Sequence, residues 1–169
     1  EIAQMLIDEF EKGDLDVAIA RAADLYGPYA TKTSVPYILA ISKLMKGKSA
    51  QWMATDKTVH TFTYTIDCAK AMLLMANDEK SFNQIWHLPS YNPPINGKEF
   101  IEFAAKEICV KPKYSVLKPW MVKLGGLFDK NISELVEMNY QYIYDYYFDS
   151  SKFEKYFNYK PTSYKQGIR

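Results

Sequence analysis

Hydrophobic and polar positions alternate between helical and strand-like spacing along the chain, and this alternation predicts an α/β fold. In residues 1–12, apolar side chains recur every three or four positions until Gly13, which predicts an amphipathic helix that ends there. Residues 15–23 then form a nearly continuous run of small and β-branched residues that ends before Gly27. Such a run is typical of a strand that is buried on both faces.

The strand-like run at residues 15–23 suggests that the sequence is part of a larger protein. A strand buried on both faces needs neighbours, and the rest of the chain barely supplies them. In addition, no Ser, Thr, Asp or Asn precedes the first helical residues, and the chain starts at Glu1 without a methionine. We therefore expect the chain to begin inside a helix of a longer polypeptide.

The remaining pattern predicts further strand-to-helix units and a second half that is mainly helical, with short strands. Helices are predicted over residues 37–45, 67–75, 98–108, 119–127, 132–142 and 151–157. Strands are predicted over residues 49–53, 61–65, 84–88, 113–117 and 140–148. In the last of these strands aromatic residues stand at every second position, and a packing role is favoured for them over base stacking.

The loop after the first strand, residues 24–32, is the most informative place in the predicted fold. In open parallel sheets, ligands bind beyond the carboxyl ends of the strands. For this loop we therefore favour a ligand site over a mere connector. Its candidate side chains are those of Asp24, Leu25, Tyr26, Tyr29 and Lys32.

Composition and charge narrow the class of protein. The chain is 48% apolar and 24% charged, which is ordinary for a soluble globular domain, and its formal net charge of +1 argues against a nucleic-acid or anionic-membrane surface. No apolar run approaches the roughly 18 residues of a membrane helix. Cys68 and Cys109 lack the spacing of a disulfide framework or a zinc site, which favours a reducing, cytoplasmic setting.

Several catalytic and binding motifs are missing from the sequence. Its seven glycines never stand in the spacing of a phosphate-binding loop, and no G-x-S-x-G is present. His60 and His87 have no acidic or cysteine cluster nearby, so no metal site is expected. Tyr156 and Lys160 match a catalytic Y-x-x-x-K, but Pro161 disfavours helical geometry at the lysine, and we reject this pair.

Some polar and aromatic residues are interpreted as structural. Asp67, at the start of a predicted helix, would satisfy free backbone N–H groups there, which is typically worth about 1 kcal/mol. Arg21, on the strand predicted to be buried, is expected to be a paired structural cation. Packing roles are assigned to Trp86, His87 and Trp120, and the loop that follows His87 offers Tyr91 and Asn92 as weaker pocket candidates.

Three segments resemble motifs of one enzyme family, the NAD-dependent epimerases/dehydratases, which are extended and atypical short-chain dehydrogenase/reductases. Residues 21–28 (RAADLYGP) resemble the family's R-x-x-N-x-Y-G-P, and residues 60–69 (HTFTYTIDCA) resemble its R-D-F-x-x-V-x-D-x-A. Residues 148–168 are similar to its tail, in which D-x-S-K is followed by P-T-x-x-x-G-I/L. The three matches occur in the family's order and span nearly the whole chain.

The resemblance implies the C-terminal part of a Rossmann-type NAD(P)-binding fold, joined to a mainly helical α+β substrate-binding domain. Residues 1–30 and 59–90 would be the remnant of the cofactor domain, and residues 31–58 and 91–169 the substrate-binding domain. In such enzymes a glycine-rich turn holds the dinucleotide and a Y-x-x-x-K pair transfers protons. Both would lie ahead of Glu1, so NAD or NADP would belong to the full-length protein, this fragment would bind neither, and no catalytic residue is assigned.

Two departures from the family's motifs affect the predicted substrate. Ala23, Asp24 and Leu25 would pass close to the nicotinamide, and Asp24 would take the place of a substrate-contacting Asn. A carboxylate only accepts hydrogen bonds and repels phosphate, whereas an amide also donates. His60 stands where nucleotide-sugar enzymes usually keep an Arg on the diphosphate. Both departures count against a nucleotide-sugar substrate. The full set of predicted substrate-binding residues is Asp24, Tyr26, Tyr29, Lys32, His60, Tyr91 and Asn92.

The sequence thus leads to one main hypothesis and two alternatives. The main hypothesis is the substrate-binding portion of an NAD(P)-dependent epimerase, dehydratase or reductase that acts on a sugar nucleotide or a related hydroxy or keto compound. As an isolated fragment it would be inactive. The alternatives are a non-catalytic ligand-binding or regulatory module of the same fold, and a fragment that self-associates as a homodimer. A small molecule is the expected partner, rather than a nucleic acid or a membrane.

Overall fold

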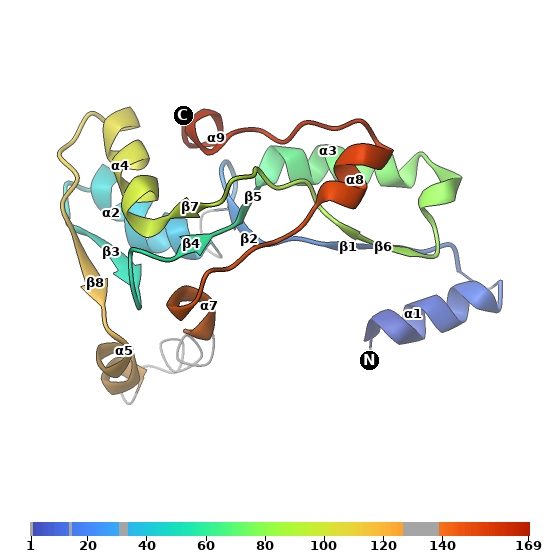
Figure 1. Cartoon of the computed structure of the whole chain (residues 1–169), viewed down its shortest axis with the longest axis horizontal. Coiled ribbons are helices and arrows are strands. Elements are labelled where there is room, and N and C mark those ends of the chain that lie inside the picture. Colours follow the sequence, from blue (N-terminus) through green and yellow to red (C-terminus); the bar gives the residue numbers. More distant parts are fainter. Residues whose placement is uncertain (1, 14, 31–33, 127–138) are drawn as a thin grey trace.

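The computed structural model describes residues 2–13, 15–30, 34–126 and 139–169. Figure 1 shows an elongated arrangement, in which helices gather at the two ends around separate pairs of strands. The first helix, α1 (Ile2–Glu11), confirms the predicted amphipathic helix.

Short strands form four two-stranded sheets, three of which are parallel. β1 (Ala18–Arg21) pairs with β6 (Gln84–His87), β2 (Asp24–Tyr26) with β5 (Phe62–Tyr64), and β3 (Ala50–Met53) with β8 (Tyr114–Leu117), all in parallel, whereas β4 (Val59–His60) is antiparallel to β7 (Ile95–Asn96). Parallel pairing with intervening helices confirms the α/β class. The strands predicted over 49–53, 61–65, 84–88 and 113–117 are confirmed within one residue at each end.

Most helices lie where the hydrophobic pattern predicts them. Figure 1 shows two of them, α3 and α8, on one side of the β1–β6 pair and α1 on the other side. The helices after α1 are η1 (Tyr37–Ile41), α2 (Ser42–Met45), α3 (Thr65–Ala76), η2 (Glu79–Ser81), α4 (Gly97–Glu107), α5 (Pro119–Gly126), α7 (Tyr140–Ile143), α8 (Ser151–Tyr156) and α9 (Tyr164–Ile168). The predicted helix over 132–142 falls mainly on residues outside the described ones.

The single buried strand predicted over residues 15–23 is wrong in two respects. The structure divides this region into β1 and β2, so that Asp24 begins a second strand instead of a loop. In addition, β1 is only partly covered, and its residues Ala20 and Arg21 are exposed. The reason is that β1 pairs with β6 alone among the described residues. Arg21 is therefore not the buried cation that the sequence suggests.

The extended strand predicted over residues 140–148 is also wrong in its first half. Residues Tyr140–Ile143 form the short helix α7, and the chain is extended only afterwards, where Tyr146 bridges to His60. Long-range contacts fix this turn: the hydroxyl of Thr58 donates to the carbonyl oxygen of Tyr142, and the Tyr142 ring is buried against Trp52. The alternating aromatic pattern does not contain that information.

Two separate hydrophobic clusters form the core, one at each end of the molecule. The larger one is rich in aromatic rings and includes Tyr26, Trp52, Phe62, Phe100 and Tyr164. Its packing is tight where α4 begins, because a Cβ atom on Gly97 would overlap the Trp52 indole. The smaller cluster joins α3, β6 and α8 through Ala71, Met75, Trp86, Leu88 and Phe153.

Of the three residues to which the sequence assigns a packing role, two are packed in the structure and one is exposed. Trp86 is fully buried and its indole N–H donates to the carbonyl oxygen of Ser81, and His87 stacks on Phe148, so these two assignments are confirmed. Trp120 is 67% exposed, because it lies at the outer start of α5, and its assignment is wrong. Cys68 and Cys109 are both free thiols. Within the described part of the chain, no helix has the length and apolarity to cross a membrane.

Candidate functional site

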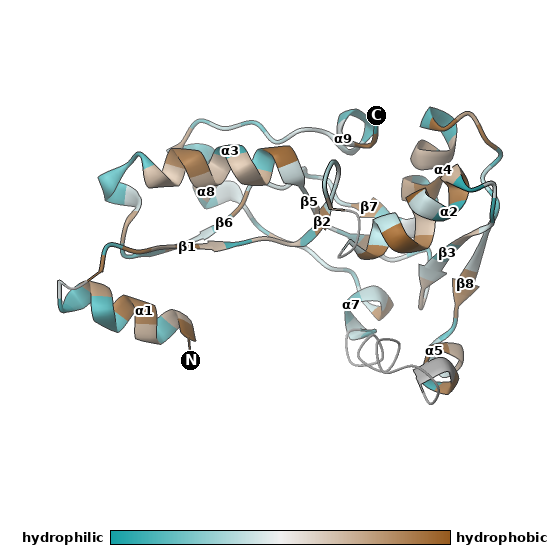
Figure 2. Cartoon of the chain, turned by 180° about the vertical axis from the view of Figure 1, so that it is seen from behind, coloured by the Kyte–Doolittle hydropathy of each residue, from teal (hydrophilic) through white to brown (hydrophobic). Residues whose placement is uncertain are grey.

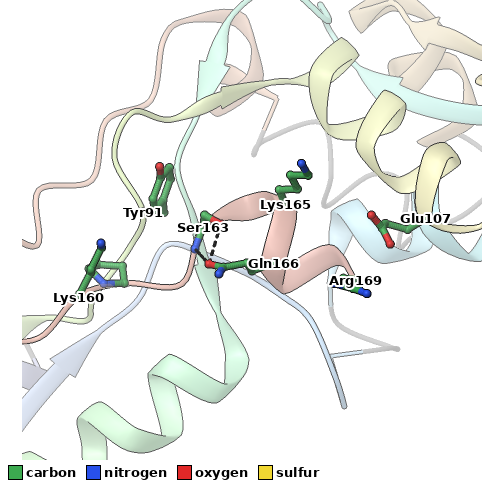
Figure 3. Close-up of a pocket in the computed structure, with 8 residues that line it drawn as sticks. Tyr91, Glu107, Lys160, Ser163, Lys165, Gln166 and Arg169 are labelled. Atoms are coloured by element: carbon green, nitrogen blue, oxygen red, sulfur yellow. Dashed lines mark hydrogen bonds between the residues drawn. The ribbon is translucent and has the colours of Figure 1, made fainter.

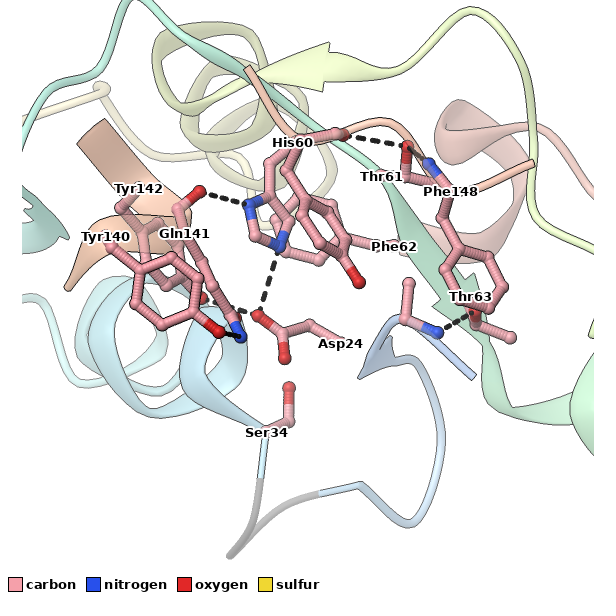
Figure 4. Close-up of polar contacts among 12 residues, drawn as sticks. Asp24, Ser34, His60, Thr61, Phe62, Thr63, Tyr140, Gln141, Tyr142 and Phe148 are labelled. Atoms are coloured by element: carbon pink, nitrogen blue, oxygen red, sulfur yellow. Dashed lines mark hydrogen bonds and ion pairs between the residues drawn. The ribbon is translucent and has the colours of Figure 1, made fainter. Parts of the chain in front are cut away.

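A compact polar cluster forms around Asp24, where β2, β4 and the segment 140–148 meet (Figure 4). Asp24 is the first residue of β2, and its side chain is 22% exposed. His60 ends β4 and its side chain is 3% exposed. The sequence selects both residues but gives no reason to place them in contact. The structure brings them together across a separation of 36 positions.

One oxygen of the Asp24 carboxylate receives two hydrogen bonds. Nε2 of His60 lies 3.1 Å from Oδ2, and the phenol of Tyr142 donates to the same atom over 2.8 Å. On the other side of the imidazole, Nδ1 lies 3.3 Å from the carbonyl oxygen of Gln141. From the described residues, no hydrogen bond reaches Oδ1 of Asp24. The hydroxyl of the buried Ser34 points toward this carboxylate in Figure 4.

Aromatic rings enclose the imidazole of His60. Tyr142 and Tyr146 stack on it with ring centroids 4.7 Å away in each case, at interplanar angles of 12° and 23°. Phe62 packs at 4.6 Å with a larger tilt of 33°. This cage fixes the plane of the ring and keeps water away from it, so the direction of its two nitrogens is set by packing.

The electrostatic environment keeps the Asp24 side chain ionised. Burial alone would raise the pKa of Asp24, but the hydrogen bonds from His60 and Tyr142, together with the charge of His60, outweigh burial and leave this pKa below its ordinary value. Burial and the neighbouring Asp24 carboxylate raise the pKa of Tyr142 well above that of a free phenol. Tyr142 is therefore a neutral hydrogen-bond donor and Asp24 an anion.

The backbone before Asp24 is fixed by a second hydrogen-bond network. The amide of Ala23 donates to Oγ1 of Thr63 over 3.1 Å, and that hydroxyl lies 2.7 Å from the hydroxyl of Ser90. Thr63 and Ser90 are both buried. The carboxyl end of β1, where the sequence predicts the nicotinamide, is thus tied to β5 and to the loop after β6.

The other predicted site residues are dispersed. Tyr26 is 1% exposed and belongs to the aromatic core, so its burial contradicts a substrate contact. Tyr29 is 93% exposed, Leu25 is half-buried beside Asp24, and Lys32 lies outside the described residues.

Tyr91 and Asn92 belong to a different part of the surface. Tyr91 lines a pocket of about 480 Å³ whose wall also includes Lys160, and Lys165 and Gln166 of α9 (Figure 3). Asn92 is exposed in the loop beside it. Neither Asp24 nor His60 lines this pocket, so the sequence-predicted substrate residues do not form a single site.

The contacts that complete the Asp24 cluster were not accessible to sequence reasoning. Tyr142 and Tyr146 belong to the aromatic series that the pattern assigns to packing, and the Gln141 contact uses a backbone oxygen. The signal that could have selected these residues is the unusual density of tyrosines after residue 139, but that density does not say which ring faces which strand.

Asp67 is structural, as expected, but with different partners. Its two carboxylate oxygens accept hydrogen bonds from the hydroxyl of Tyr159 at 2.8 Å, and from the amide and hydroxyl of Thr162 at 2.6 and 2.9 Å. The buried carboxylate thus fastens the chain between α8 and α9 to the first turn of α3, instead of capping that helix.

Comparison with known proteins identifies the fold. No family model matches the sequence, and the search of curated proteins found no match. Among solved structures, the chain is similar to a UDP-glucose 4-epimerase from Thermus thermophilus in complex with NAD, with a TM-score of 0.71 and 16% identity. It is also similar to a dTDP-glucose 4,6-dehydratase from Bacillus anthracis in complex with NAD, with a TM-score of 0.71 and 13% identity.

A third similar structure is an epimerase from Methanothermobacter thermautotrophicus, with a TM-score of 0.75 and 9% identity. Each match covers 98% of this chain but only 46%, 48% and 45% of the dehydratase, the UDP-glucose epimerase and the third structure, respectively. The chain therefore spans about half of the length of the structures it matches. Over that length, it has the fold of the Rossmann-type epimerases and dehydratases.

Proposed function

We propose that this chain is the substrate-binding part of an NAD(P)-dependent epimerase, dehydratase or reductase, which acts on a sugar nucleotide or a related hydroxy or keto compound. The observation that carries the proposal is the fold match over 98% of the chain, with TM-scores near 0.7, to structures solved with NAD. In the proposed division, residues 1–30 and 59–90 belong to the cofactor domain and residues 31–58 and 91–169 to the substrate domain.

The residues present do not fit a complete dinucleotide site. A dinucleotide pyrophosphate needs closely approaching backbone N–H groups, which a glycine-rich turn between a strand and a helix supplies. The seven glycines of this chain never stand in that spacing. Ala23 and Asp24, which follow β1, can only border a nicotinamide held by other residues. The proposed enzyme therefore takes its cofactor site from sequence outside these 169 residues.

Calorimetric titration of the chain with NADH tests this proposal. We expect no binding in the micromolar range for the 169-residue chain, because the pyrophosphate site is missing. We expect such binding to return when the chain is produced together with the segment encoded ahead of Glu1. Micromolar affinity of the 169-residue chain alone would contradict the proposed division of the enzyme.

A second candidate function is a non-catalytic binding module of the same fold. The pairing of Asp24 with His60 favours it, because two polar groups at the candidate site satisfy each other instead of a reacting substrate. The coding sequence ahead of Glu1 distinguishes the two candidates. A glycine-rich loop with a Y-x-x-x-K supports the enzyme, and a glycine-rich loop without that tyrosine supports the binding module.

A further inference from the structure

The surface formed by the loop after β6, α4 and α9 contains two adjoining hollows. The first, of about 480 Å³, is lined by Tyr91, Lys160 and Ser163 among others (Figure 3). The second, of about 360 Å³, shares Tyr91, Ser163 and Lys165 with the first and continues along α4 to Phe103. We call the two hollows together the α9 groove. Each volume lies in the range of small-molecule binding sites.

The first hollow has an excess of positive charge. Lys160, Lys165 and Arg169 line it, and Glu107 is the one acidic residue among the described residues of its wall. Figure 3 shows Glu107 on the opposite side of the hollow from Lys160. Within the described part of the chain, neither Lys160 nor Lys165 forms an ion pair. The whole chain has a formal net charge of only +1, so this local excess is not a general property of its surface.

The free hydrogen-bonding groups of the first hollow are mainly donors. Lysine ammonium groups can only donate. The side-chain oxygen of Gln166 already accepts from the amide of Ser163 at 3.3 Å and from its hydroxyl at 2.9 Å. The NH₂ group of Gln166 is therefore the part of that side chain left for a ligand. A ligand that fits this hollow must bring hydrogen-bond acceptors and negative charge.

The second hollow is apolar over much of its wall. Pro93, Pro94 and Phe103 line it together with Tyr91, and Phe103 is 36% exposed. The acidic residue Glu99 also lines it, but its carboxylate is engaged in the capping box at the start of α4. A flat apolar group that covers such a wall gains free energy, because it removes aromatic and proline surface from water.

We propose that the α9 groove binds an aryl phosphate. The phosphate group would lie among Lys160, Lys165 and the NH₂ group of Gln166, and the aromatic body would lie against Phe103. A phosphate suits the first hollow because its oxygens accept several charge-assisted hydrogen bonds at once. An anion between two ammonium groups also offsets their mutual repulsion. The inference does not rest on the proposed function, since it involves neither NAD(P) nor the cluster around Asp24.

Titration of the 169-residue chain with phenyl phosphate, followed by nitrogen-15 NMR, tests this site. We expect the amide signals of residues 91–95 and 160–166 to shift most. Inorganic phosphate lacks the ring and should bind about fivefold more weakly, because it makes no apolar contact in the second hollow. Phenol lacks the charge and should also bind more weakly than phenyl phosphate. Added salt should weaken phenyl phosphate binding, since exposed charges are screened.

Two substitutions separate the contributions of charge and apolar contact. Lys165→Gln should weaken the binding of phenyl phosphate and of inorganic phosphate alike, by about threefold. Phe103→Ser should weaken the binding of phenyl phosphate and leave that of inorganic phosphate unchanged. Lys155→Gln is the matched control, because it makes the same chemical change at an exposed position of α8 and should behave as wild type.

Three results would overturn the proposal: no shifts in the α9 groove up to the solubility limit of phenyl phosphate, equal affinities for phenyl phosphate and inorganic phosphate, or equal phenyl phosphate binding by Lys165→Gln and Lys155→Gln. If Phe103→Ser does not fold, the comparison of the two phosphates in the wild-type chain decides on the apolar contact. NADH takes no part in these measurements. The outcome of the NADH titration therefore leaves the assignment of the α9 groove unaffected, and a failure here leaves the proposed enzyme unaffected.

Discussion

At the scale of single residues, the Asp24 cluster shows how a buried charge is tolerated. The Asp24 carboxylate lies within hydrogen-bond distance of the His60 imidazole and accepts a hydrogen bond from the Tyr142 phenol, the other imidazole nitrogen faces a backbone carbonyl, and aromatic rings exclude water from the imidazole. Removing one member of such a cluster leaves the others unsatisfied, which costs more than the net value of the bond that is lost.

Replacement of Tyr142 by Phe should destabilise the chain by about 1.5–3 kcal/mol, the usual value of a hydrogen bond to a charged group. Tyr26→Phe is the matched control, since Tyr26 is equally buried and its hydroxyl has no partner among the described residues. That variant should be neutral or slightly more stable. Urea unfolding of the two variants measures the difference, and equal stabilities would show that the Tyr142 bond contributes nothing.

The lowered pKa of Asp24 gives a pH dependence with a definite sign. The ordinary pKa of an aspartate side chain is 3.8, and the folded chain holds the pKa of Asp24 below that value. The folded state thus binds fewer protons at this group than the unfolded state. The stabilisation by Asp24 should be complete above the ordinary carboxyl range and should be lost as the pH falls through the lowered folded value.

Unfolding experiments on the wild-type chain and Asp24→Asn between pH 6 and pH 3 measure this contribution. The stability difference between them should shrink toward the acid end. A difference that grows on acidification would mean that folding raises the pKa of Asp24 instead of lowering it.

The sequence identifies Asp24 and His60 through motif resemblance, yet it does not reveal their contact. Motif comparison places residues along the chain, whereas the contact depends on how β2 and β4 lie relative to each other. The contact of Tyr142 with Asp24 could not be predicted for the same reason, because the two residues are 118 positions apart in the sequence. The sequence predicts a loop at Tyr26, but the structure has the strand β2 there. The Tyr26 side chain is therefore buried in the core and does not reach a ligand.

At the scale of secondary-structure elements, some helices are positioned by local capping residues and others by contacts with distant parts of the chain. α4 has a complete capping box, in which Asn96 and Glu99 bond to each other's backbone, and its pattern predicts it almost to the residue. α7 lacks a side-chain cap, and packing of Tyr142 holds it. The position of α4 therefore follows from local signals, whereas that of α7 depends on a distant partner.

The start of α4 offers a test of packing at this scale. Gly97→Ala should destabilise the chain by about 1–3 kcal/mol, because the added methyl group meets the Trp52 indole in a core that cannot expand freely. Lys98→Ala, at the next and exposed position of the same helix, should change stability by less than about 0.5 kcal/mol. Thermal unfolding followed by tryptophan fluorescence compares them, and an unaltered Gly97→Ala variant would show that the indole moves aside.

The attachment of the C-terminal segment depends on Asp67. Asp67→Ala removes the acceptor for Tyr159 and Thr162, so the chain between α8 and α9 should detach locally while α3 stays folded. Hydrogen exchange should then accelerate at the Thr162 amide, with little change at the centre of α3. Equal acceleration in both places would indicate global destabilisation instead of a local fastening.

At the scale of the whole molecule, the clearest feature is the apolar surface around β1. Figure 2 shows hydrophobic residues along both α1 and α3, and within these helices Ile2, Met5, Met72 and Leu73 are between 53% and 76% exposed. β1 itself has one paired edge among the described residues. Surfaces of this kind are uncommon on isolated monomers, because they gain free energy when another surface covers them.

We therefore expect the 169-residue chain to self-associate through this surface at high concentration. Replacing Met72 by Lys places a charge on the α3 part of this surface and should shift the chain toward monomer in multi-angle light scattering. Met45→Lys is the matched control, since Met45 is also 63% exposed but lies on α2 at the other end of the molecule. A wild-type chain that stays monomeric at high concentration would contradict the prediction. Equal effects of the two substitutions would instead place the contact elsewhere on the molecule.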